Sequence, residues 1–124
     1  KQPVLGICLG MQLMCHHTEE GDTDGLNIFE VKVKRFSNHL KVPHMGWNTI
    51  DNLKSRLFDA VNANEYQYFV HSFYAELSSD TIATTGYGIN YSAALMKDNF
   101  FGVQFHPEKS GKVGEQILKN FIEL

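Results

Sequence analysis

The first part of the chain changes from a short, continuous apolar run to a pattern of helix-forming residues. A short apolar run over residues 4–7 leads into Cys8 and Gly10, and helix-forming residues follow directly. This succession predicts a strand over residues 4–7, a sharp turn, and a helix over residues 9–16. The next segment, residues 17–25, is polar and rich in turn formers, which predicts a loop.

Alternating apolar and polar side chains dominate the middle of the chain. Phe29, Val31 and Val33 alternate with charged residues, which is the period of a half-buried strand. β-Branched and aromatic runs predict further strands over residues 66–74, 81–87, 91–96 and 100–105. Helices are expected near residues 57–61 and over residues 113–124, the latter with an apolar face formed by Ile117, Leu118, Phe121 and Ile122.

Residues 42–50 form an irregular stretch. Pro43 and Gly46 interrupt an otherwise strand-like pattern that carries Trp47, the only tryptophan. Aromatic residues presented on such a rigid turn favour a contact surface. A core aromatic is the alternative for Trp47.

Composition narrows the class of protein. The chain of 124 residues fits one domain, 1–124, and its 43% hydrophobic and 20% charged residues are typical of a water-soluble globular protein. A net charge of -3 gives no basic field for nucleic acid or an anionic membrane. No long apolar run or signal-peptide pattern is present. A cytoplasmic protein is expected, because the only two cysteines are not expected to form a disulfide.

The cysteines and histidines suggest neither a disulfide nor a metal site. Cys8 and Cys15, the only cysteines, are separated by the turn and the expected helix, so a mutual disulfide is not expected. We expect Cys15 to be a small buried residue. Four histidines lack the regular spacing of metal ligands: His16, His17, His39 and His44.

The motif Gly-x-Cys-x-Gly at residues 6–10 is the thiol counterpart of a nucleophile elbow. Small residues on both sides permit a tight turn that projects Cys8 above the sheet. The helix N-terminus is expected to favour the thiolate, and the N–H of Leu9 could donate to an oxyanion. The alternative is a buried cysteine in a glycine-rich turn.

A thiol nucleophile needs a base, and His106 with Glu108 could supply one. They follow the last predicted strand, where open α/β sheets build their sites. We expect Pro107 to hold the chain extended, so that Glu108 can orient the imidazole. A structural loop histidine is the alternative for His106.

Residues 6–12 and 102–108 together resemble the class I, triad-type glutamine amidotransferases. Residues 43–48, residues 68–73 and Lys109-Ser110 are similar to the glutaminase subunits of imidazole glycerol phosphate synthases. The resemblance covers nearly all of the chain from residue 4. It implies an α/β, flavodoxin-like amidotransferase domain with a mixed sheet and a nucleophile elbow.

The resemblance implies a mechanism without a cofactor. Cys8 would attack the carboxamide of glutamine, His106 would transfer protons, and Glu108 would orient His106. Water would hydrolyse the thioester to glutamate. The ammonia would pass to a (β/α)8-barrel cyclase subunit, which uses it on a phosphoribulosyl aminoimidazole nucleotide in histidine biosynthesis.

The resemblance also assigns contacts. Substrate binding is implied for Gln12, Glu20, His71, Ser72 and Phe73, where family members often have Tyr instead of Phe73. A solvated acidic loop is the alternative for Glu20, and a structural strand histidine for His71. Docking on the cyclase is implied for Met45, Trp47 and Lys109.

The start of the chain departs from the family. The resemblance implies earlier strands and a Pro-Gly-Val-Gly-type loop with a second oxyanion donor, and neither precedes residue 4. We therefore expect an N-terminally incomplete fold with an exposed sheet edge, prone to association, and impaired activity. Alternatives are an amidotransferase of another pathway, a γ-glutamyl hydrolase, or a non-catalytic binding module.

Overall fold

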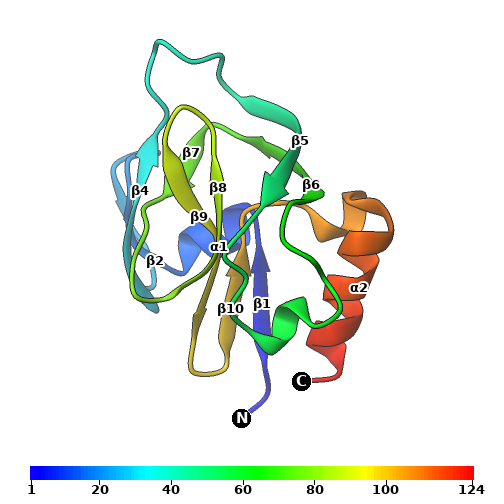
Figure 1. Ribbon diagram of the computed structural model, residues 1–124. Helices are drawn as coiled ribbons and strands as arrows, with labels where there is room; N and C mark the ends of the chain where they lie inside the picture. The colour runs from blue at the N-terminus through cyan, green and yellow to red at the C-terminus, as the bar shows by residue number, and fades with distance from the viewer.

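A computed structural model describes all residues, 1–124. Its main sheet is mixed and has the strand order β1-β10-β9-β7-β4-β2-β3, with β8 paired to β9 (Figure 1). The strands are β1 (Val4–Ile7), β2 (Cys15–Thr18), β3 (Thr23–Asp24), β4 (Phe29–Arg35), β7 (Phe73–Ala75), β8 (Thr81–Gly86), β9 (Asn90–Lys97) and β10 (Phe100–Val103). The α/β class with a mixed sheet is confirmed.

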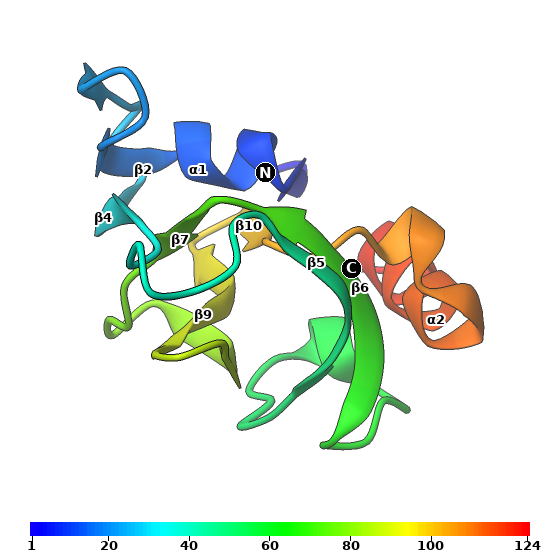
Figure 2. The same cartoon turned by 90° about the horizontal axis from the view of Figure 1, so that it is seen from above.

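A second sheet contains the antiparallel pair β5 (His44–Ile50) and β6 (Glu65–His71). The helices are α1 (Leu9–Leu13) and α2 (Gly111–Ile122), with short 3-10 turns η1 (Arg56–Phe58) and η2 (Pro107–Lys109). Viewed from above, β5 and β6 curve around one side of the molecule, and α2 lies outside β6 (Figure 2). No helix is both long and apolar enough to span a membrane.

Parallel pairing of β1 with β10 positions the site. Gly6 is in register with Gly102 and Ile7 with Val103, so both strands end at the same edge of the sheet. The segments that follow, Cys8 and residues 104–106, therefore meet there. As expected, β1 is an edge strand, because it pairs only with β10.

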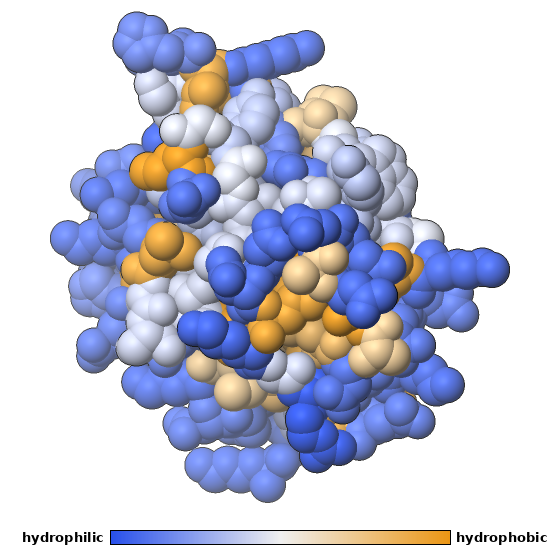
Figure 3. Space-filling view, viewed as in Figure 1, coloured by the Kyte–Doolittle hydropathy of each residue, from blue (hydrophilic) through white to orange (hydrophobic).

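The core contains two apolar clusters on either side of the main sheet. The larger one joins β5, β6, β8, β9, β10 and α2 around buried aromatic residues such as Phe69, Tyr91 and Phe105. The smaller one packs Met11 and Phe29 between α1, β2 and β4. On the face of the molecule shown in Figure 3, the apolar residues lie mainly in a central patch that hydrophilic residues surround.

Several element boundaries differ from the prediction. The first helix ends at Leu13, and Cys15–Thr18 forms β2, because backbone carbonyls of this segment accept N–H groups of residues 25–29 instead of helical ones. The strand predicted over residues 66–74 breaks at Ser72 into β6 and β7, and the helix expected at 57–61 is the 3-10 turn η1. The predicted loop 17–25 contains β3.

The apolar face predicted for α2 is partly wrong. Ile117 is fully buried, but the side chain of Ile122 is 80% exposed. The buried face instead includes Gly114 and Asn120. Asn120 Nδ2 donates to the carbonyl oxygens of Leu57 at 2.9 Å and Asp59 at 2.7 Å, so a polar side chain fixes α2 to η1.

Candidate active site

Cys8 stands at a sharp turn between β1 and α1. Its backbone has φ 54° and ψ -108°, a left-handed conformation that costs a non-glycine residue energy and often marks a functional site. A Cβ on Gly6 would lie 2.8 Å from the backbone of Gly10, whereas a Cβ on Gly10 would meet nothing within 4 Å. The tight turn therefore requires a glycine at residue 6 but not at residue 10.

The predicted site residues around Cys8 gather at one pocket. It has a volume of about 250 Å³ and is lined by Cys8, Leu9, Gln12, Glu20, Val70, His71, Ser72 and Phe73. These residues come from the turn, α1, the loop after β2, and the segment from the end of β6 to the start of β7. The predicted nucleophile, oxyanion donor and substrate contacts thus share one hollow.

The Cys8 thiol makes two weak contacts at this pocket. Its Sγ donates to the carbonyl oxygen of Val70 at 3.8 Å and accepts from Gln104 Nε2 at 3.6 Å. Burial raises the pKa of Cys8, opposed by the N–H of Leu9 and the Gln104 amide, while the charges of Glu108 and Glu20 raise it further. The Leu9 N–H at the start of α1 favours the thiolate, as expected, but desolvation by burial outweighs it, so the net pKa of Cys8 is raised.

His106 and Glu108 form a short pair after β10. His106 Nδ1 lies 2.8 Å from Glu108 Oε2, which fixes the imidazole and leaves its Nε2 for another partner. The segment is not extended as predicted, because residues 107–109 form the 3-10 turn η2, yet the two side chains still meet. No hydrogen bond links the Cys8 thiol to His106.

The position of His106 is fixed by its own backbone. Its N–H donates to the carbonyl oxygen of Tyr68 at 2.9 Å. The buried Ser110 side chain donates through Oγ to the His106 carbonyl at 2.6 Å, and the Tyr68 N–H donates to Ser110 Oγ at 2.9 Å. Strand β6 and the His106 turn are therefore joined by two hydrogen bonds at Tyr68, and the Ser110–His106 bond closes the turn itself.

His71 belongs to a buried polar cluster behind the pocket. Its Nδ1 donates to the carbonyl oxygen of Phe73 at 2.7 Å, and its Nε2 accepts from the Tyr91 hydroxyl at 3.0 Å. His44 Nδ1 lies 3.3 Å from the same Nε2. Burial lowers the pKa of His71 to about 4 and also lowers that of His44, so both are neutral near pH 7. This supports the structural alternative for His71.

The predicted docking residues are exposed. The side chains of Met45 and Trp47 are 64% and 54% exposed on the outer face of β5, and Lys109 is exposed on η2. Trp47 contacts the ring of Tyr68 edge-on, at 5.8 Å between centroids. The core alternative for Trp47 is therefore wrong.

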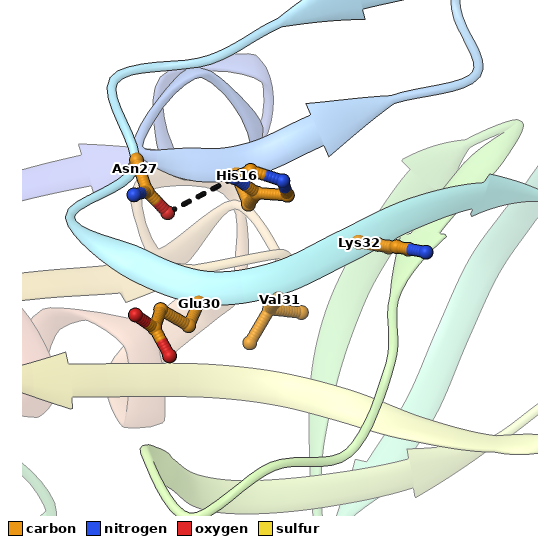
Figure 4. Close-up of a pocket in the computed structure, with 5 residues that line it drawn as sticks. All are labelled: His16, Asn27, Glu30, Val31 and Lys32. Carbon is orange, nitrogen blue, oxygen red and sulfur yellow. Dashed lines mark hydrogen bonds between the residues drawn. The ribbon is translucent and has the colours of Figure 1, made fainter.

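A second hollow, of about 300 Å³, is lined by His16, Asn27, Glu30, Val31 and Lys32 (Figure 4). His16 Nδ1 lies 3.1 Å from Asn27 Oδ1 across it. None of the predicted site residues lines it, and no group of three or more metal-ligating side chains is placed to hold an ion. Cys15 is fully buried, as predicted, and burial raises its pKa to about 12.

The sequence pattern of the family "Glutamine amidotransferase class-I" matches residues 1–124. The chain belongs to this family. Among relatives of this amidotransferase chain, the imidazole glycerol phosphate synthase subunit HisH of Bacteroides thetaiotaomicron is 59% identical over 127 residues, covering 100% of this chain and 65% of the relative. The HisH subunit of Haemophilus influenzae is 50% identical, covering 98% of this chain and 62% of the relative.

Solved structures share the fold of this amidotransferase chain. A putative GMP synthase protein from Thermoplasma acidophilum has a TM-score of 0.71 at 21% identity, covering 98% of this chain and 56% of that chain. A glutamine amidotransferase from Thermotoga maritima has a TM-score of 0.63 at 18% identity, with coverages of 98% and 47%. The chain thus spans roughly half to two thirds of the length of the proteins it matches.

One residue of the site was missed by the sequence analysis. Gln104 is fully buried after β10, and its side chain contacts both the Cys8 thiol and Gln12. It lies within residues 102–108, which carry the family resemblance, but no role was assigned to it there. Pattern alone does not separate such a residue from a polar strand end.

Proposed function

We propose that this chain is the catalytic part of a glutaminase that supplies ammonia to a cyclase subunit of imidazole glycerol phosphate synthase in histidine biosynthesis. The observation that carries the proposal is the single pocket that Cys8 shares with Gln12, Glu20 and the end of β6. The paired His106 and Glu108 do not line this pocket, but the Glu108 charge acts on the Cys8 thiol. The HisH relatives at 50–60% identity favour this pathway over that of the more distant GMP synthase type.

The proposed chemistry is acyl transfer to sulfur. Cys8 Sγ attacks the carboxamide carbon of glutamine while His106 takes the thiol proton. The Leu9 N–H donates to the oxygen that becomes an anion, and His106 returns a proton to the departing ammonia. Glu108 holds the imidazole through Nδ1 and stabilises its charged form. Water then hydrolyses the thioester to glutamate.

Substrate recognition is proposed for the polar groups of the pocket. Glu20 would receive the α-ammonium group of glutamine, and Gln12 would accept from a substrate N–H. His71, Ser72 and Phe73 would contribute through the backbone that lines the pocket, since the His71 ring is engaged inside the core. No cofactor is required, and two free thiols suit the cytoplasm as the compartment.

Glutamate production tests the proposal. The chain is incubated with glutamine, with and without a barrel cyclase subunit. We expect glutamate release when the cyclase is present, because Cys8 and His106 make no hydrogen bond to each other in the chain alone. Cys8→Ala should abolish release, and Cys15→Ala, which changes only a buried residue outside the pocket, should retain it. No glutamate under either condition, or release that survives Cys8→Ala, would contradict the proposed function.

Partner binding is tested separately. We propose that Met45, Trp47 and Lys109 dock on the barrel cyclase, and that Trp47 is an anchor because its large side chain is exposed. Trp47→Ala should weaken binding by about tenfold or more in calorimetry. Leu77→Ala, which also removes an exposed apolar side chain but lies after β7, is the matched control. An equal loss in both variants would speak against this docking face.

A further inference from the structure

Gln104 connects two parts of the proposed active site. Its Nε2 donates to Cys8 Sγ at 3.6 Å, and its Oε1 accepts from Gln12 Nε2 at 2.9 Å. We propose that Gln104 is a positioning residue that supports the Cys8 thiolate with one end of its amide and sets the orientation of Gln12 with the other. The glutamine-binding half of this inference rests on the proposed function, whereas the thiol half does not.

The backbone around Gln104 makes it a rigid support. Its own N–H donates to the carbonyl oxygen of Ala93 at 2.8 Å. The carbonyl oxygen of the preceding Val103 accepts from the Cys8 N–H at 2.8 Å. The Gln104 side chain is fully buried. The amide is therefore fixed relative to the turn that carries Cys8.

A buried N–H donor has its largest effect on the thiol when sulfur becomes charged. Hydrogen bonds to ionised groups are stronger than those between neutral groups, and low dielectric strengthens them further. Around Cys8, burial and the carboxylates of Glu20 and Glu108 oppose ionisation. The Gln104 amide and the Leu9 N–H favour ionisation of the thiol. Loss of Gln104 would therefore leave the Leu9 N–H as the only one of these two donors that stabilises the thiolate.

The other end of the amide decides what Gln12 presents to the pocket. Both N–H groups of Gln12 are engaged, because Nε2 donates to Phe73 O at 3.0 Å and to Gln104 Oε1 at 2.9 Å. No hydrogen bond within the protein uses Gln12 Oε1, and Gln12 lines the pocket. Gln12 thus offers an acceptor oxygen, which suits the N–H groups of glutamine.

The thiol half is tested by alkylation of the chain with iodoacetamide across a pH range. Tandem mass spectrometry separates Cys8 from the fully buried Cys15, which serves as an internal control. Gln104→Met removes both polar ends at similar length, and the midpoint pH of Cys8 alkylation should rise by about one unit. An unchanged midpoint in a variant with a normal thermal melt would overturn the inference.

Gln104→Glu separates the two halves and guards against misfolding of the first variant. Because burial raises the pKa of an introduced carboxyl, both measurements on Gln104→Glu are made above that pKa. There the ionised Glu still accepts from Gln12 but cannot donate to sulfur, so the alkylation midpoint should rise while KM for glutamine stays near that of the unsubstituted chain. Gln104→Met should instead raise KM by about tenfold. Equal KM values in Gln104→Glu and Gln104→Met would overturn the inference that Gln104 orients Gln12. Absence of glutamine turnover in the unsubstituted chain contradicts the proposed function and leaves the alkylation result to decide the thiol half.

Discussion

The turn at Cys8 depends on close contact between two short backbone segments. Gly6 packs directly on Gly10 and Met11, so any side chain at residue 6 would have to displace backbone. Gly10 has open space beside it and lies within α1. The two glycines of one motif therefore have different physical roles.

Gly6→Ala should lower the free energy of unfolding by about 1–3 kcal/mol, because backbone cannot yield as a flexible side chain can. Gly10→Ala is the matched control and should be neutral or stabilising by up to about 1 kcal/mol, since Ala is the better helix former. Urea unfolding measures both variants. Equal destabilisation would show that the turn does not have this packing.

At the scale of elements, α2 is held by a narrow set of contacts. Ile117 enters the larger apolar cluster, and Asn120 binds two carbonyl oxygens of η1 and its C-terminus. Ile122, the last residue of α2, extends into solvent. The helix is thus amphipathic over a shorter stripe than its sequence indicates.

Ile117→Ala should destabilise the chain by about 2–5 kcal/mol, because it leaves a cavity in a packed core. Ile122→Ala removes the same atoms from an exposed position and should change the free energy of unfolding by less than about 0.5 kcal/mol. Both values come from urea unfolding followed by circular dichroism. Similar values for the two variants would contradict the packing of α2.

Elements that depend on local pattern were predicted well, and those that depend on tertiary contacts were not. Strand β4 follows the alternation of its side chains, and β8 and β9 lie where β-branched and aromatic runs predicted strands. Residues 14–16 have side chains that are compatible with a helix. Gly25, however, packs against the Cys15 carbonyl, and the N–H groups of residues 25–29 bind the backbone carbonyls of residues 13–16 that would otherwise accept helical hydrogen bonds. Pairing across a turn overrides helix propensity there.

The candidate site shows the same division. Gly-x-Cys-x-Gly and His-Pro-Glu are local motifs, and the parallel pairing of β1 with β10 brings their segments to one sheet edge. The raised pKa of Cys8 and the role of Gln104 follow from burial and from contacts between distant segments. Residue spacing therefore predicts neither the raised pKa of Cys8 nor the role of Gln104.

At the scale of the whole molecule, a buried cluster joins the two sheets. His44 and His71 come from β5 and β6, and Tyr91 comes from β9. The Phe36 ring lies against both histidines and Tyr91. The cluster accommodates neutral imidazoles only, so its stability depends on pH.

The free energy of unfolding should fall as pH decreases from about 6.5 to about 4. In this range the unfolded chain protonates His71 at its ordinary pKa, while burial and the nearby His44 and His106 keep the folded pKa at about 4. The contribution of His71 to this decrease in the free energy of unfolding should reach about 3 kcal/mol and then level off below pH 4. Urea unfolding between pH 7 and pH 4 measures it.

His71→Asn should reduce this slope, because the titrating group is gone. His39→Asn, in the exposed segment before β5, should leave the slope unchanged. A slope that persists in His71→Asn would assign the acid sensitivity to other groups.

Strand β6 has two surfaces that belong to one rigid unit. On its outer side the Tyr68 ring supports Trp47, and at the same residue the backbone is bonded to His106 and Ser110. Ser110 closes the ring by its bond to the His106 carbonyl. The exposed Trp47 on the proposed docking face is therefore connected through a single residue, Tyr68, to the backbone that holds His106, so the surface and the base share one support.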